Sequence, residues 1–206
     1  MSATGDRRPI AARETAPARA ATAWLAARGV SADAISAAGM FCGLLAGLLL
    51  ALAPGQGAWA WLAGALCVQL RLLANMLDGM VAVARNVASP RGELWNEVPD
   101  RVSDTAALVG LGVAAGDLAL GTGAALAAMA TAYVRAVGKG AGAGSDFSGP
   151  MAKQQRMFVV TLVAFACALL PAAWSAMLPA VALWVILAGS LLTTLRRLAR
   201  IAARLG

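Results

Sequence analysis

The chain has 206 residues, of which 60% are hydrophobic and only 13% are charged, and its net charge is +7. This composition lies far outside the range of a soluble globular domain and indicates an integral membrane protein. The basic residues fall at the termini and between hydrophobic runs rather than along one polar face, which favours anionic lipid headgroups over nucleic acid as their partner.

The first 30 residues precede the first long apolar run. Residues 1–15 are polar and predict a flexible cytoplasmic tail. Residues 16–28 are rich in alanine and carry Trp24 between Arg19 and Arg28, which predicts a short helix lying in the membrane interface, with a simple continuation of the tail as the alternative. The remaining residues, 31–206, are expected to form one membrane domain.

Six hydrophobic segments follow, each close to the roughly 20 residues that a spanning helix needs. They are expected near residues 34–53, 58–83, 93–115, 118–137, 157–174 and 178–195. The predicted fold is therefore an all-α integral membrane protein with six transmembrane helices and a polar cavity facing the cytoplasm. Gly43 and Gly47, spaced four apart in the first segment, predict close helix packing there.

The loops predict the orientation. Lys and Arg gather in the N-terminal tail and in segments 85–91, 135–156 and 196–204, whereas the turns at 54–57, 116–117 and 171–177 have none. Because basic loops stay on the cytoplasmic side, both termini are expected in the cytoplasm. We expect a multi-pass protein of a bacterial-type inner (cytoplasmic) membrane.

Polar residues interrupt the second segment with helical spacing. Arg71, Asn75, Asp78 and Ala82 recur every three or four residues and therefore share one helix face, with Gly79 beside Asp78. Such a face inside a hydrophobic helix needs an explanation, because the rest of the segment is suited to lipid.

The third segment has a matching acidic face. Glu93, Glu97, Asp100 and Asp104 share it, and Asn96 lies one turn before Asp100. A short turn at residues 89–92 would pack the second and third segments side by side and bring their polar faces together. Pro99 removes a backbone hydrogen bond and is expected to kink the third helix beside Asp100.

Charged residues near helix ends often only mark the boundary with water, and that is the simple alternative here. However, an ionisable group within a membrane helix costs roughly 2.5–3.5 kcal/mol, so acids deep in a helix are usually functional. Several acids on one face would also repel each other unless a cation lay among them. Oxygen ligands suit magnesium, manganese or calcium, and the chain has no histidine for zinc.

A glycine-rich stretch at residues 138–156 is flanked by basic side chains. Flexible backbone with several cations predicts an anion site, plausibly for a phosphate, although cytoplasmic charge can also serve only to set topology. Arg135, at the end of an apolar helix, and Lys153, within a compact turn, are the strongest candidates, followed by Arg156.

At its central stretch the sequence resembles the CDP-alcohol phosphotransferase family, membrane enzymes of phospholipid synthesis. The family signature reads D-x-x-D-G-x-x-A-R, then eight residues, then G-x-x-x-D-x-x-x-D. The matching positions here are Asn75, Asp78, Gly79, Ala82, Val83, Gly92, Asn96 and Asp100, with the spacing kept throughout. Six helices with the signature across the second and third also match the family, so the resemblance covers most of the chain.

Three positions depart from the signature. Asn75 and Asn96 replace two of the four aspartates that hold divalent metal in the family, and Val83 replaces the arginine. Metal affinity falls with the charge of the ligands, so a weaker site, a single metal or a catalytically silent relative are all open. Glu93, Glu97 or Asp104 are candidates to compensate for the lost charge, and Arg85 is a candidate substitute for the arginine.

The resemblance implies a transferase that moves a phosphatidyl group from a CDP-alcohol, such as CDP-diacylglycerol, to an alcohol acceptor and releases CMP. Asp100 would be the catalytic base, because it matches the family's last aspartate. The implied metal ligands for Mg or Mn are Asn75, Asp78, Asn96, Asp100 and Asp104. Gly79, Ala82 and Gly92 would leave room for the cytidine nucleotide.

The acceptor follows from the basic loop. Arg135, Lys153 and Arg156 would bind a phosphate on it, which favours glycerol 3-phosphate or an inositol phosphate. The resemblance also implies a homodimer. The alternatives are a catalytically silent relative of the family and a small membrane carrier.

Overall fold

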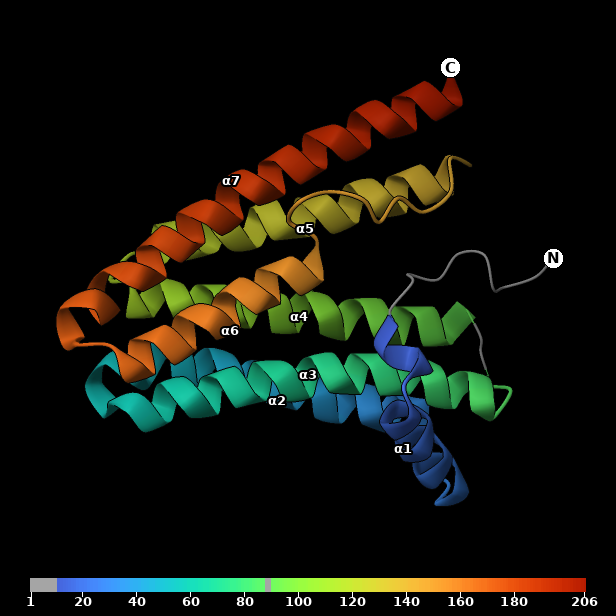
Figure 1. Cartoon of the computed structure of the whole chain (residues 1–206). Helices are drawn as coiled ribbons and strands as arrows, with labels where there is room; N and C mark the ends of the chain where they lie inside the picture. The colour runs from blue at the N-terminus through green and yellow to red at the C-terminus, as the bar shows by residue number, and fades with distance from the viewer. Residues whose placement is uncertain (1–10, 88–89) are drawn as a thin grey trace.

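The computed structural model describes residues 11–87 and 90–206, without the side chains of Ala11, Pro90, Arg91, Glu93 and Asn96. The described residues form helices and connecting loops (Figure 1). The elements are η1 (Ala11–Glu14), α1 (Ala16–Ala27), α2 (Ala32–Gln56), α3 (Ala58–Ala84), α4 (Pro90–Ala114), α5 (Leu118–Gly140), α6 (Lys153–Leu169) and α7 (Ala172–Leu205). The predicted all-α class is confirmed.

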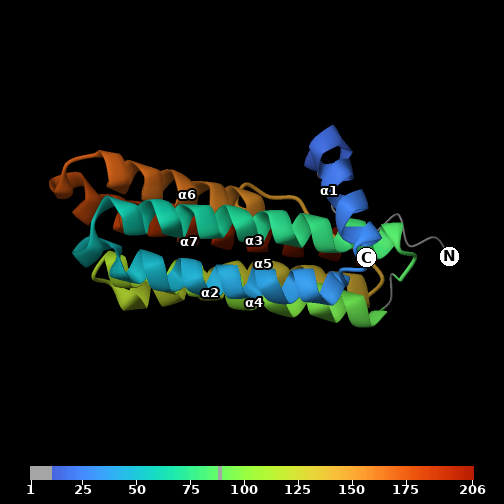
Figure 2. The same ribbon diagram turned by 90° about the horizontal axis from the view of Figure 1, so that it is seen from below.

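Helices α2 to α7 form an elongated bundle, and the short α1 lies steeply across it at one end (Figures 1 and 2). Helix α2 packs on both α3 and α4, and α5 packs on α7. Because successive helices alternate in direction, the α3–α4 connection, the α5–α6 loop and the C-terminus lie at the same end as α1. All the basic segments of the described chain therefore share one end of the bundle, as the positive-inside pattern requires.

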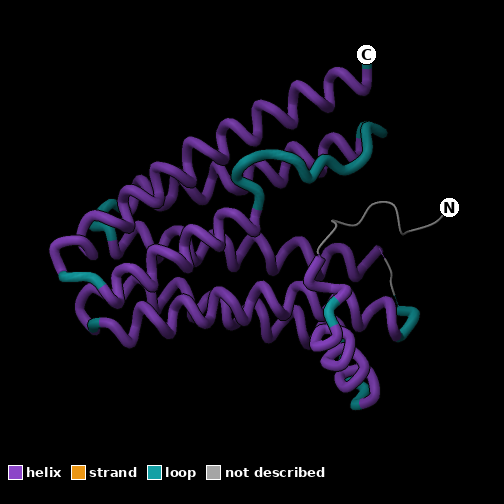
Figure 3. The backbone as a smooth tube through the Cα atoms, in the orientation of Figure 1, coloured by secondary structure: helices purple, strands orange, loops and turns teal. Residues whose placement is uncertain are grey.

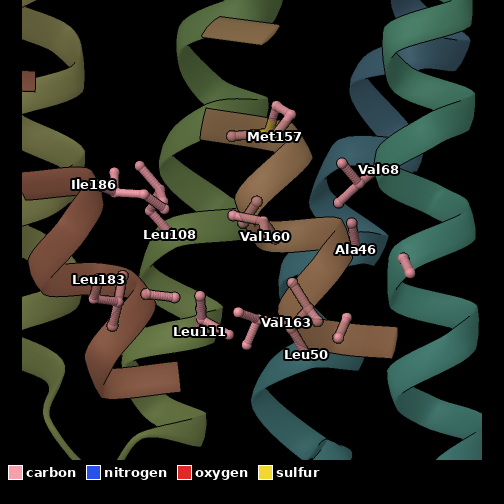
Figure 4. Close-up of a cluster of buried hydrophobic side chains, with 14 of the residues drawn as sticks. Ala46, Leu50, Val68, Leu108, Leu111, Met157, Val160, Val163, Leu183 and Ile186 are labelled. Carbon is pink, nitrogen blue, oxygen red and sulfur yellow. The ribbon is translucent and has the colours of Figure 1, made fainter. Parts of the chain in front are cut away.

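Aliphatic side chains fill the middle of the bundle (Figure 4). Leu108 and Leu111 of α4 meet Val160 of α6 and Leu183 and Ile186 of α7. Around them the bundle leaves many large apolar side chains exposed on its outside. An outer surface of this kind suits lipid, because hydrocarbon tails and not water would cover it.

Among the described residues, four helices are long and apolar enough to cross a membrane: α2, α3, α5 and α7. Helix α6 has 17 residues, and the first half of α4 carries the acidic face. The expected multi-pass architecture is supported, and six complete spans remain a prediction.

The last two helices differ from their predicted bounds. Helix α6 begins at Lys153 instead of near residue 157, and α7 begins at Ala172 instead of near residue 178. The predicted turn at 171–177 is therefore mostly helix. Pro171 occupies the N-cap of α7, where its missing N–H and fixed φ do no harm, and alanines follow it directly.

The α5–α6 loop turns back along α5 and enters the bundle before α6 begins (Figure 3). Helix α7 fixes it there: the Met151 N–H donates to Thr193 Oγ1 at 3.0 Å, and Arg197 Nε donates to the Ser148 carbonyl at 2.9 Å. The first residues of α6, which include Lys153, are therefore buried inside the bundle. This explains why α6 is the shortest helix of the bundle.

The outer part of the loop is tied to the end of α7 by Asp146. Its carboxylate accepts hydrogen bonds from the N–H and the hydroxyl of Ser148 and lies 3.4 Å from Arg204 Nη2. Burial alone raises the pKa of Asp146, but these bonds, with the charges of Arg204 and Arg200, outweigh it and hold the pKa below its usual value. The aspartate is thus ionised at neutral pH and anchors the loop.

Small residues allow α2 and α4 to touch, as Gly43 and Gly47 predict. A Cβ at Gly43 would overlap Ser103, and one at Gly47 would overlap the backbone of Ala106. Gly110 of α4 completes the contact, since a Cβ there would overlap the Gly47 carbonyl. This close approach brings the polar face of α4 against the start of α2.

We expect Gly47→Ala to lower the stability of the protein by about 1–3 kcal/mol, because the added methyl group forces the two helices apart. Gly123→Ala is the matched control: no atom lies within 4 Å of its added Cβ, so the better helix propensity of alanine should leave stability equal or higher. Thermal unfolding in detergent micelles measures both. Equal loss in the two variants would contradict the close contact.

Candidate functional site

Asp100 of α4 lies at the point where α3, α4 and the start of α6 meet. Its carboxylate oxygen Oδ1 accepts hydrogen bonds from both Arg71 of α3 and Lys153 of α6. The second oxygen lies 3.6 Å from Arg101 Nη2. All three of Arg71, Asp100 and Lys153 are buried, so the expected catalytic aspartate is held between two buried cations.

Asp104, one turn further along α4, forms a second buried ion pair. Arg156 Nη2 donates to its carboxylate at 3.2 Å, and Lys153 Nζ lies 3.8 Å away. Arg156 also donates to the Met151 carbonyl at 2.8 Å and is 1% exposed, so its two terminal nitrogens are held inside the bundle, whereas its Nε has no hydrogen-bond partner among the described residues. The loop, α4 and α6 are joined through this arginine.

A third pair lies nearer the surface. Arg135 Nη2 of α5 donates to Glu97 Oε1 at 2.6 Å, and its guanidinium lies 5.1 Å from the ring centre of Phe147. Each basic residue expected to bind phosphate thus faces an acidic residue of α4. Of the three, Arg135 has the most exposed side chain.

Asp78 of α3 has a different environment. Its carboxylate accepts hydrogen bonds from Ser36 Oγ at 2.6 Å and from the Gly79 N–H at 2.5 Å, and among the described residues no ion pair includes it. One turn earlier on the same face, the Asn75 side-chain oxygen is buried without a hydrogen-bond partner. Two side chains of adjacent turns on α3 thus form no ion pair among the described residues, and the amide oxygen of Asn75 also has no hydrogen-bond partner.

These two side chains suit a hard divalent ion such as Mg²⁺ or Mn²⁺, because a carboxylate and an amide carbonyl are the ligands such ions take. An ion would also satisfy the orphaned amide oxygen of Asn75. Asp100 and Asp104 are engaged by cations instead. Within the described part of the chain, no three His, Cys, Asp or Glu side chains gather as a metal-binding group.

A cavity of about 390 Å³ opens between α1 and the end of α3. Gly79 and Val83 of the signature line it, together with Arg13 and Arg19 from the N-terminal segment. Arg13 reaches towards Gly79, since a Cβ at that glycine would lie 3.9 Å from Arg13 Nη2. The two arginines thus lie beside Val83, the position that the expected signature assigns to an arginine.

Other predicted residues have less definite places. Ala82 is half-buried on α3, and Gly92 lies in the first turn of α4, which begins at Pro90 and so includes part of the expected turn. Arg85 donates to the carbonyls of Gly29 and Val30, so it holds the α1–α2 connection. The side chains of Asn96 and Glu93, and all of Ser89, lie outside the described residues.

Several site residues were not singled out from the sequence. Ser36 reaches Asp78 from α2, and Ser103 accepts a hydrogen bond from Arg71 Nε at 3.1 Å. Arg13 and Arg19 belong to a segment that was read as tail and interfacial helix. Helical spacing does mark Ser103, one turn after Asp100 in sequence, but Ser36 and the arginines depend on contacts between distant segments.

No protein-family model matches the chain, and no curated protein sequence matches it. Solved structures of the phosphatidylinositol phosphate synthase PgsA1 of Mycobacterium tuberculosis are similar to it. The form with CDP-DAG bound superposes with a TM-score of 0.74 at 22% identity, covering 88% of this chain and 92% of that one. The complex with manganese and citrate gives 0.75 at 22% identity, covering 89% and 88%.

The apo form of PgsA1 gives a TM-score of 0.72 at 21% identity, covering 89% of this chain and 95% of that one. At these identities the comparison establishes a shared fold along nearly the whole length of both chains. The expected all-helical bundle is therefore confirmed, whereas the six spans and the polar cavity facing the cytoplasm remain predictions.

We expect Asp104→Asn to destabilise the protein by about 3–5 kcal/mol, because it leaves the buried charge of Arg156 without its carboxylate. Asp33→Asn, an exposed aspartate in the first turn of α2, is the control and should change stability little. Thermal unfolding in detergent compares them. Similar shifts for both would show that the Asp104–Arg156 pair does not hold the loop and helices together.

Proposed function

We propose that this protein is a CDP-alcohol phosphatidyltransferase that moves a phosphatidyl group from CDP-diacylglycerol to an alcohol acceptor and releases CMP. The observation that supports it most is the buried ion pair of Asp100 with Arg71, which holds Asp100 against the α3 face that carries Asn75 and Asp78, in a fold shared with a synthase crystallised with CDP-DAG bound. The fold alone does not carry an activity, so the proposal rests on these residues.

The reaction would be a displacement at the lipid-side phosphorus of the donor. The acceptor oxygen forms the new bond to phosphorus, and the bond to the bridging oxygen breaks, so that CMP leaves with that oxygen. Asp100 would take the proton of the attacking hydroxyl. A divalent ion held by Asn75 and Asp78 would supply charge neutralisation of the diphosphate.

The nucleotide end of the donor would lie at the cavity beside Gly79. The absence of a side chain there, with the small Ala82 and Gly92 at neighbouring positions of the signature, leaves room for it. Arg13 and Arg19 would supply the positive charge that the signature's arginine provides elsewhere. The lipid tails would remain in the bilayer around α1 and α3.

The acceptor would carry a phosphate, which favours glycerol 3-phosphate or an inositol phosphate. Arg135 and Lys153 each pair with an acid of α4, and a phosphate would compete with Glu97 and Asp100 for them. Arg156, which is more deeply buried, would contribute indirectly through its ion pair with Asp104. We expect a homodimer in a bacterial-type inner membrane, with six spans and both termini in the cytoplasm.

A second candidate is a relative that binds the donor without turning it over. The ion pairs of Asp100 favour it, because two cations already occupy the carboxylate oxygen that would take the proton, and the asparagines at positions 75 and 96 reduce the charge available to a metal. A small membrane carrier is a third alternative. Both differ from the transferase in releasing no CMP.

The purified protein with CDP-diacylglycerol and Mg²⁺ or Mn²⁺ should release CMP when a phosphorylated alcohol is added. We would compare glycerol 3-phosphate, inositol phosphate, inositol and serine, and expect Asp100→Asn to lower the rate at least about 100-fold through loss of the base. No release with any acceptor from folded protein would favour the silent relative. Release with serine alone would contradict the phosphorylated acceptor.

Replacing Arg19 by alanine should raise the KM for CDP-diacylglycerol about tenfold and change kcat little, because a charged hydrogen-bonding group is lost from the nucleotide cavity. Arg28→Ala is the matched control: the same charge is removed from α1's end, where the guanidinium stacks 4.0 Å from the Trp24 ring centre and lines no part of the cavity. Steady-state CMP release gives both constants. Equal effects of the two variants would indicate a general surface charge instead.

A further inference from the structure

Arg71 is a buried cation on the same face as the expected metal ligands. It lies one turn before Asn75 on α3 and is 3% exposed. Gly39 of α2 makes room for it, since a Cβ at that glycine would lie 2.7 Å from Arg71 Nη1. The guanidinium therefore lies in the space left by the missing side chain of Gly39. It stays inside the bundle and does not extend to the membrane surface.

The contacts of Arg71 are directed to α4. Nη2 donates to Asp100, and Nε donates to Ser103 Oγ at 3.1 Å. Ser103 itself donates to the Pro99 carbonyl at 2.7 Å, which leaves its oxygen free to accept from the guanidinium. Two hydrogen bonds from one planar group to one helix fix Arg71 as a rigid positive charge at Asp100.

The carboxylates of Asp100 and Asp104 already have buried cations as partners. Three buried cations, Arg71, Lys153 and Arg156, face these two carboxylates. The space left between Arg71, Ser103, Asp104 and Lys153 is about 10 Å³, near the minimum for one water molecule. A further divalent cation at Asp100 would meet like charges at close range and would find no room on this side.

We propose that Arg71, together with Lys153, takes the place of a metal-bound charge at Asp100, so that Asp100 is not a metal ligand. A divalent ion is then confined to the other part of the face, at Asn75 and Asp78. The role of Arg71 towards a donor diphosphate rests on the proposed function. If the protein binds such a donor, the fixed guanidinium would supply part of the positive charge that the diphosphate requires, whether or not metal is bound.

The test measures metal binding without substrate, so that its result is independent of whether the protein is a transferase. Mn²⁺ is titrated into the full-length protein in nanodiscs, and free Mn²⁺ is followed by electron paramagnetic resonance. We would compare the wild type with Asp100→Asn, Arg71→Leu, Arg71→Lys and the double variant Arg71→Leu with Asp100→Asn. Arg71→Lys is the matched control because it keeps the charge.

We expect Asp100→Asn to bind Mn²⁺ as the wild type does. Arg71→Leu should bind one additional ion or bind about tenfold more tightly, since Asp100 then keeps Lys153 as its one buried cation, and the double variant should lose this gain. Arg71→Lys should show none of it.

Weaker Mn²⁺ binding in folded Asp100→Asn would overturn the proposal, and so would an unchanged isotherm in folded Arg71→Leu. If Arg71→Leu does not fold, the comparison of Asp100→Asn with the wild type decides alone. Failure of the CMP assay, by contrast, leaves this result intact.

Discussion

The ion pairs of Asp100 with Arg71 and Lys153 are the contacts on which the arrangement of the bundle depends. An ionised carboxylate among membrane helices is costly unless opposite charges lie within hydrogen-bonding distance. Its partners come from α3 and from the start of α6. The carboxylate of Asp100 therefore has both cations only if α3, α4 and α6 meet at the same level along the bundle. The glycine contact between α2 and α4 and the inward turn of the α5–α6 loop are the two features that make this meeting possible.

Much of this arrangement could be predicted from the sequence, because it depends on local periodicity. Helical spacing placed Arg71, Asn75 and Asp78 on one face, and Gly43 and Gly47 indicated close helix packing, although not that α4 is the partner. Helical periodicity does not predict which basic side chain pairs with which acidic side chain. The pairing of Lys153 with Asp100 depends on a loop whose path is set by Thr193 and Arg197, more than 40 residues further along the chain. The start of α7 was misplaced because Pro171 indicates a turn equally well when it ends a loop and when it begins a helix.

The two polar regions of the bundle have different chemistry. On α3, Asn75 and Asp78 keep oxygens that no cation of the described residues neutralises, whereas on α4 the carboxylates are neutralised internally. A protein with four free carboxylates would repel itself until metal bound. In this chain the carboxylates of α4 already have buried cations as partners, and the metal site that we propose lies on α3 alone.

The length of the α5–α6 loop, between Gly140 and Lys153, affects the site in a way that the length of a surface loop seldom does. Insertions in an exposed loop usually extend into water and leave the rest of the protein unchanged. Here both ends are held, by α5 at one side and by Thr193 at the other, and the segment determines how far α6 starts from the membrane surface. One residue more or less would turn Lys153 by about 100° around the helix axis and aim its ammonium group away from Asp100. The loop therefore works as a fixed-length spacer, and the geometry of the site depends on its length as well as on the identity of the charged residues.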